Sequence, residues 1–72
     1  MSQCKSVREV IEEIKEGYKE SIQNELESIH TSIKMNHIDR AKESTDLIDK
    51  YREKISLLDQ VMYRLEQEAN IE

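Results

Sequence analysis

The chain has 72 residues, of which 38% are charged and 36% are hydrophobic, with one glycine and no proline. This length allows a single small domain over residues 1–72, and the scarcity of turn-forming residues argues against a multi-stranded sheet. The net charge is −5, and the basic residues are interleaved with acidic ones. This pattern argues against a nucleic-acid partner, because binding to phosphates requires clustered lysine and arginine side chains.

The N-terminal region and the single cysteine bear on localisation. No apolar segment reaches the length of about 7–15 residues that a secretory signal needs, or the roughly 18 residues of a membrane span. Cys4 is the only cysteine, so it cannot close an intramolecular disulfide, which favours a reducing compartment. We therefore expect a cytoplasmic protein that does not insert into a membrane.

Apolar residues in the first half recur every three or four positions, which predicts a helix over about residues 6–34. They are Val7, Ile11, Ile14, Tyr18, Ile22, Leu26, Ile29 and Ile33, and Val10 widens the stripe at its start. Their mean step is about 3.7 residues, slightly longer than that of a straight α-helix. Gly17 lies inside this helix, where glycine costs about 1 kcal/mol relative to alanine. We expect it to be a tolerated, exposed glycine.

A turn is expected near residues 35–37, where Asn36 tolerates the left-handed conformation and is also a candidate N-cap. A second helix is predicted over about residues 38–69, because its apolar residues have a mean step of about 3.5, the heptad spacing of packed helices. The row comprises Ile38, Ala41, Thr45, Ile48, Tyr51 or Arg52, Ile55, Leu58, Met62, Leu65 and Ala69. A break at residues 44–46 is an alternative. We favour an all-α fold, an antiparallel two-helix hairpin.

The second helix carries more apolar residues than a two-helix seam can cover. Leu57 and Val61 widen its apolar row to about 160° of the circumference, and Leu47 continues the same face. Tyr51 and Tyr63 are of a residue type enriched at interface hot spots, although Tyr63 lies outside this arc. We therefore predict a partner-binding surface, so that oligomerisation or a helical-repeat partner completes the core. Its residues are Leu47, Tyr51, Leu57, Leu58, Val61, Met62, Tyr63 and Leu65.

Residue types that perform catalysis or bind metals are present, but their spacing does not support either role. Glu27 and His30 match the Glu-x-x-His spacing of di-iron bundles, yet Glu27 lies opposite the apolar stripe. The serines lack a strand–turn–helix elbow. The acidic residues are explained as a solvated helix face, supported by pairs such as Asp46 with Lys50. We expect no enzymatic activity, no cofactor and no metal site.

An acidic chain of this length, with a heptad-like second helix and a surplus apolar face, resembles the small needle-protein co-chaperones of bacterial type III secretion. This YscE/PscE/EscE family is most similar over residues 38–43, followed by Tyr51 and Leu58. The resemblance covers the whole chain in length and layout. It implies a non-enzymatic protein that pairs with a tetratricopeptide-like chaperone, and the two keep the needle subunit soluble and unpolymerised in the cytoplasm.

Two other functions are compatible with the same residues. One is a homodimeric four-helix bundle with a regulatory role, whose self-association would cover the apolar face. The other is a small adaptor that occupies a helix-binding groove of another protein. All three are binding functions and differ in what covers the apolar surface.

Overall fold

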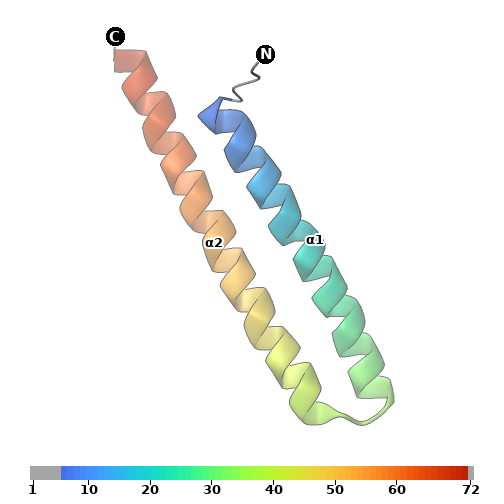
Figure 1. The fold of residues 1–72 in the computed structure, drawn as a ribbon. Coiled ribbons are helices and arrows are strands. Elements are labelled where there is room, and N and C mark those ends of the chain that lie inside the picture. Colours follow the sequence, from blue (N-terminus) through green and yellow to red (C-terminus); the bar gives the residue numbers. More distant parts are fainter. Residues whose placement is uncertain (1–5, 72) are drawn as a thin grey trace, which may run out of the picture.

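The computed structural model describes residues 6–71, with side chains up to residue 68, as two long helices joined by a short turn (Figure 1). Helix α1 spans Val7–Lys34 and helix α2 spans Ile38–Ile71. The helices run antiparallel and pack against each other, which confirms the all-α hairpin. The helix boundaries agree with the predicted ones to within two residues. Cys4 and the side chain of Ala69 lie outside the described residues.

The start of α1 is defined by a reciprocal capping box. The Ser6 hydroxyl accepts a hydrogen bond from the backbone N–H of Glu9 at 3.2 Å, and the Glu9 carboxylate accepts one from the backbone N–H of Ser6 at 3.1 Å. The first N–H groups of a helix have no partner within the helix, so this exchange satisfies two donors at once. The start of α1 is therefore determined by contacts between residues that are close in the sequence.

The end of α1 is set by Asn36, which has the left-handed φ of 64°. The backbone N–H of Asn36 donates to the Ile33 carbonyl at 3.0 Å, and that of His37 donates to the Ser32 carbonyl at 2.7 Å. These two bonds form a Schellman motif, which uses a left-handed residue to satisfy the last carbonyls of a helix. The left-handed conformation predicted for Asn36 is confirmed. Asn36 closes α1, however, and does not act as the N-cap of α2, which begins two residues later.

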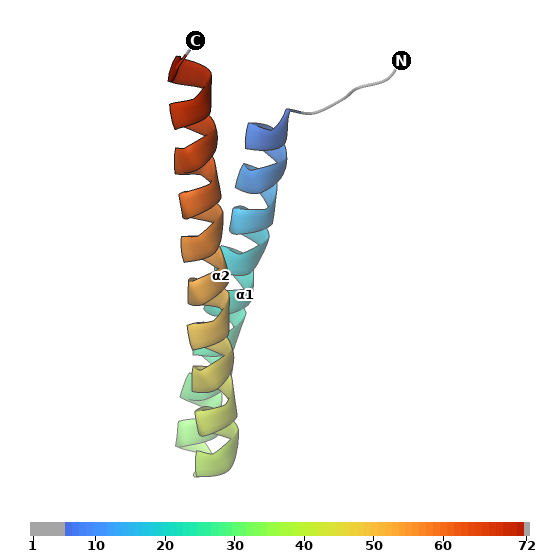
Figure 2. The ribbon, with the colours of Figure 1, turned by 90° about the vertical axis from the view of Figure 1, so that its left-hand side faces the viewer.

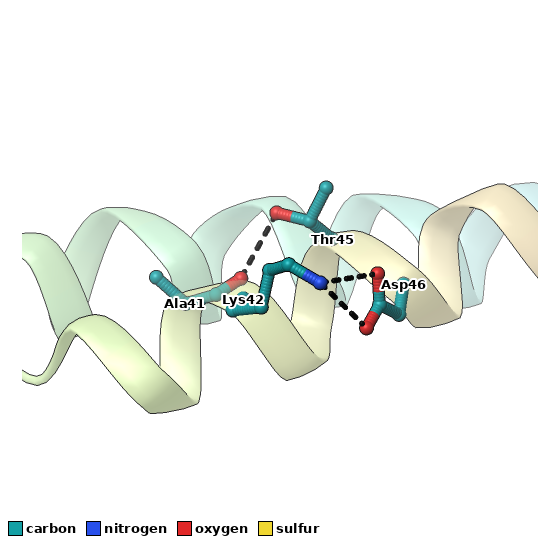
Figure 3. A network of polar contacts seen from close by, with 4 residues as sticks. All are labelled: Ala41, Lys42, Thr45 and Asp46. Atoms are coloured by element: carbon teal, nitrogen blue, oxygen red, sulfur yellow. Dashed lines mark hydrogen bonds and ion pairs between the residues drawn. The ribbon is translucent and has the colours of Figure 1, made fainter.

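Helix α2 continues without interruption through residues 44–46, so the alternative of a break there is wrong. The Thr45 hydroxyl donates to the Ala41 carbonyl at 2.9 Å, one turn earlier, and therefore does not act as a helix cap (Figure 3). The Asp46 carboxylate pairs with Lys42 at 3.3 Å, where the spacing argument predicted Lys50.

Most of the buried and half-buried side chains form one seam between the helices. On α2 the seam residues alternate in steps of three and four, and they are Ala41, Ser44, Ile48, Tyr51, Ile55, Leu58 and Met62. On α1 the same alternation gives Ile11, Lys15, Tyr18, Ile22, Glu25, Ile29 and Ser32. The rings of Tyr18 and Tyr51 meet in this seam with centroids 5.7 Å apart. Alternating steps of three and four are the heptad pattern of helices that pack side by side.

Two details of the seam differ from the predicted rows. Ser44, and not Thr45, is buried on α2, because the strict heptad falls on residue 44. On α1 the seam includes Lys15, Glu25 and Ser32, whereas several residues of the predicted apolar stripe are exposed. The exposed ones are Val7, Ile14, Leu26 and Ile33.

The hairpin is a plate one helix thick. Its Cα atoms extend over 56 × 30 × 11 Å, and Figure 2 shows it from the edge, where the helices overlap near the turn and separate toward the termini. The radius of gyration is 16.8 Å, against about 11 Å for a compact chain of this length. Two helices can cover only one stripe of each other, so both broad faces of the plate lie open.

Candidate protein–protein interface

One broad face of the plate is bordered by ion pairs between the helices. Lys15 Nζ lies 2.5 Å from Asp59 Oδ1, and Arg8 Nη2 lies 2.7 Å from Glu66 Oε2. Asp59 and Glu66 are seven residues apart, so they lie on the same side of α2. The hydrogen bond from the Lys15 ammonium to Asp59 is the main cause that raises the pKa of Lys15 above its usual value. We call this side the ion-paired face.

The opposite broad face is apolar. An open depression between the helices is lined by Ile14, Tyr18, Lys54, Leu57 and Leu58, which places Ile14 of α1 beside Lys54 and Leu57 of α2. Asp59 follows Lys54 by five residues, which is about 140° around the helix, so this depression lies on the side away from the ion pairs.

Residues at heptad spacing extend this surface along both helices. Val7 precedes Ile14 by seven residues, while Leu47 and Val61 lie seven residues on either side of Lys54. Val7 and Leu65 also line a second depression near the chain ends, which they share with Met62 and with Arg8 and Glu66 of the ion-paired face. We define the apolar face by seven residues, all between 38% and 59% exposed, namely Val7, Val10, Ile14, Leu47, Leu57, Val61 and Leu65.

The structure divides the eight predicted partner-binding residues into three groups. Tyr51, Leu58 and Met62 lie in the seam. Met62 is only 9% exposed, so it contributes to the contact between the two helices. Tyr63 is exposed and lines a separate depression that also includes Asp59 of the ion-paired face. The other four lie together on the apolar face, and they are Leu47, Leu57, Val61 and Leu65.

Sequence reasoning missed the contribution of α1 to the apolar face. Apolar periodicity assigns Val7, Val10 and Ile14 to the stripe that packs against the second helix, yet all three are exposed. A signal for this was present in the step of about 3.7 residues on α1, which differs from the step of about 3.5 on α2. Two rows of different period cannot stay in register, so part of the longer-period row turns out of the seam.

Leu26 is an exposed apolar residue of α1 that lies outside the apolar face. Leu26 follows Ile14 by twelve residues, which is about 120° around α1, so it leaves the seam on the other side from the apolar face. Leu26 and Ile14 are exposed to the same degree, 43% and 42%. The pair therefore offers a matched comparison between the two sides of one helix.

The described part of the chain offers no arrangement that suggests metal binding. Glu27 and His30 are both exposed on α1, and no group of three or more histidine, cysteine, aspartate or glutamate residues among those described is placed to hold a metal ion. Neither α1 nor α2, over their described residues, combines the length and hydropathy that crossing a membrane requires. Comparison with protein-family models, with curated proteins and with solved structures found no match to this chain.

Proposed function

We propose that this chain is a non-enzymatic co-chaperone of type III secretion that pairs with a tetratricopeptide-like chaperone and so helps to keep the needle subunit soluble in the cytoplasm. The observation that carries the proposal is the apolar face, to which both helices contribute. Contiguous apolar patches of this kind mark interaction sites in soluble proteins. The resemblance in length and layout to the YscE/PscE/EscE family suggests which class of protein the partner belongs to.

The geometry of the plate suits such a partner. Helical-repeat proteins stack helix pairs, and each pair buries its faces against its neighbours. A flat hairpin 56 Å long can therefore add to such a stack as one further helix pair, with its apolar face toward the repeats. Because the partner binds only the folded hairpin, the complex stabilises the hairpin by mass action.

The proposal is tested by co-expressing the chain with the tetratricopeptide-like chaperone and the needle subunit of a type III system, followed by size-exclusion chromatography. We expect the three proteins to elute together. Leu57→Asp and Val61→Asp, at positions 52% and 47% exposed, should abolish the complex, because each buries a carboxylate in an apolar contact. Leu26→Asp is the matched control and should leave it intact.

Circular dichroism of each isolated variant checks that helix content is retained. Binding that survives both Leu57→Asp and Val61→Asp would show that the apolar face is not the interface. An isolated chain that never associates with the chaperone would refute the secretion function itself.

A further inference from the structure

The α1 side of the apolar face carries no charged residue. Val7 and Val10 each begin a row at heptad spacing along this side of the helix. After Ile14 the two rows continue with small or uncharged polar residues, namely Gly17, Ser21, Asn24, Ser28 and Thr31. Ser21 and Ser28 are half-buried, as expected for positions beside the seam. Charge within this face therefore comes from α2.

Two lysines occupy the middle of the α2 side. Lys54 lies between Leu47 and Val61 in one heptad row. Lys50 precedes Leu57 by seven residues in the adjacent row. Among the described residues, neither lysine has an ion-pair partner. The same rows carry acidic residues only toward their ends, each about one turn from an arginine, and these neighbours are Arg40 with Glu43 and Arg64 with Glu68.

The face therefore has an excess of positive charge at its centre, although the net charge of the whole chain is −5. The ion pair between Lys15 and Asp59 fixes the level of this charge along the hairpin. Because the helices are antiparallel, Lys54 is about level with Ser21, and Lys50 is one turn closer to the connecting turn. The face thus has an apolar part near the chain ends and a basic part, defined by Lys50 and Lys54, beside it.

A partner that covers the apolar part also covers Lys54. This lysine lines the same depression as Ile14 and Leu57, so its ammonium group loses water when the depression is filled. A charge that loses water without gaining a partner is costly, and a carboxylate on the partner offsets that cost. A second copy of the chain is disfavoured, because it would bring one basic centre against another.

We propose that the apolar face binds an acidic amphipathic helix of a partner protein, which lies lengthwise between α1 and α2. Apolar residues of that helix, spaced by three and four, cover the apolar part, and two carboxylates one turn apart pair with Lys50 and Lys54. The inference rests on the proposed function, because it uses the same face and names the chemistry of the partner's contact. The acidic excess on the rest of the hairpin repels such a helix, so the basic part selects where it binds.

Two synthetic peptides test the inference against the full 72-residue chain. Both are fluorescently labelled amphipathic helices with the same leucines at spacings of three and four. The acidic peptide carries glutamate, and the basic peptide lysine, at the two positions that meet Lys50 and Lys54. In fluorescence anisotropy at low salt we expect the Kd of the acidic peptide to be about tenfold lower. The net charge of −5 alone would favour the basic peptide, so this order of affinities reports the local charge of the face.

Charge variants locate the contact. Lys54→Glu should weaken binding of the acidic peptide about tenfold, whereas Lys54→Arg should leave it nearly unchanged. Arg52→Glu is the matched control, because it changes the net charge by the same amount at an exposed position of the same helix. Residue 52 lies about 160° around α2 from residue 54, so the control should retain the preference for the acidic peptide. Circular dichroism establishes that each variant retains its helices.

Three results would overturn the inference. They are equal or tighter binding of the basic peptide, an equal loss with Arg52→Glu and Lys54→Glu, and a self-associated chain that binds neither peptide. A chain that selects the acidic peptide through Lys54 but never binds the chaperone would refute only the secretion function. A chaperone complex that forms equally well with Lys54→Glu would refute only the inference.

Discussion

Replacing Gly17 by alanine should stabilise the hairpin. Gly17 lies in the interior of α1, and a Cβ atom built on it would meet no neighbouring atom within 4 Å. The steric term is therefore negligible, and the difference in helix propensity decides the sign. Glycine is about 0.8–1.0 kcal/mol less favourable than alanine in a helix interior. We expect Gly17→Ala to add about 0.5–1 kcal/mol to the free energy of unfolding.

Thermal unfolding followed by circular dichroism measures this change, with both proteins at the same concentration because self-association shifts the midpoint. For a chain of this size, 1 kcal/mol corresponds to a rise in Tm of about 4–8 °C. Gln23→Ala, at an exposed position of the same helix, is the control and should change Tm much less, since glutamine is already a good helix former. An unchanged or lower Tm for Gly17→Ala would refute the reasoning and would indicate that another chain packs against Gly17.

Three further predictions concern the helix ends and the ion-paired face. Asn36→Ala should lower the free energy of unfolding, measured in urea, by about 1 kcal/mol, because alanine is strained at the left-handed φ of 64°. Asn36→Gly should not lower this free energy. Equal losses for the two variants would contradict the argument. Ser6→Ala should cost about 1 kcal/mol through loss of the capping box, while Ser6→Asp, which retains a cap, should lose less. The pKa of Lys15 is raised in the folded chain, so its stabilising effect is complete below the unfolded value of about 10.4 and is lost as pH rises through the higher folded value. The difference in urea midpoint between wild type and Lys15→Gln should thus stay constant from neutral pH to about pH 10 and shrink above pH 10. A difference in midpoint that has already vanished near pH 8 would contradict the predicted pH dependence.

Features that depend on neighbouring residues were predictable from the sequence. The helix boundaries follow from apolar periodicity, and the turn follows from the one residue type between the two rows that readily adopts a left-handed conformation. The propensities and hydrogen bonds involved act over a few residues, so no knowledge of the partner helix is needed. The tolerated exposure of Gly17 was likewise predictable and agrees with the open space around it.

The division of apolar residues between seam and surface was only partly predictable. The row on α2 keeps the heptad period, so most of its seam was assigned correctly. The row on α1 has a longer period and therefore crosses the seam, from Ile14 on the apolar face, through Ile22 between the helices, to Leu26 on the other side. Assigning each residue requires the register between the helices, which the pairs Arg8–Glu66 and Lys15–Asp59 reveal only in three dimensions.

The sequence by itself determined that the chain forms two long helices and carries more apolar surface than two helices can cover. Tertiary structure decided where that surface lies. Val7, Val10 and Ile14 join Leu57 and Val61 on one face because the shorter period of α2 selects which side of α1 is buried. Helix formation is governed by local interactions, whereas the composition of a shared face depends on how two separate segments align, and only the folded chain specifies that alignment.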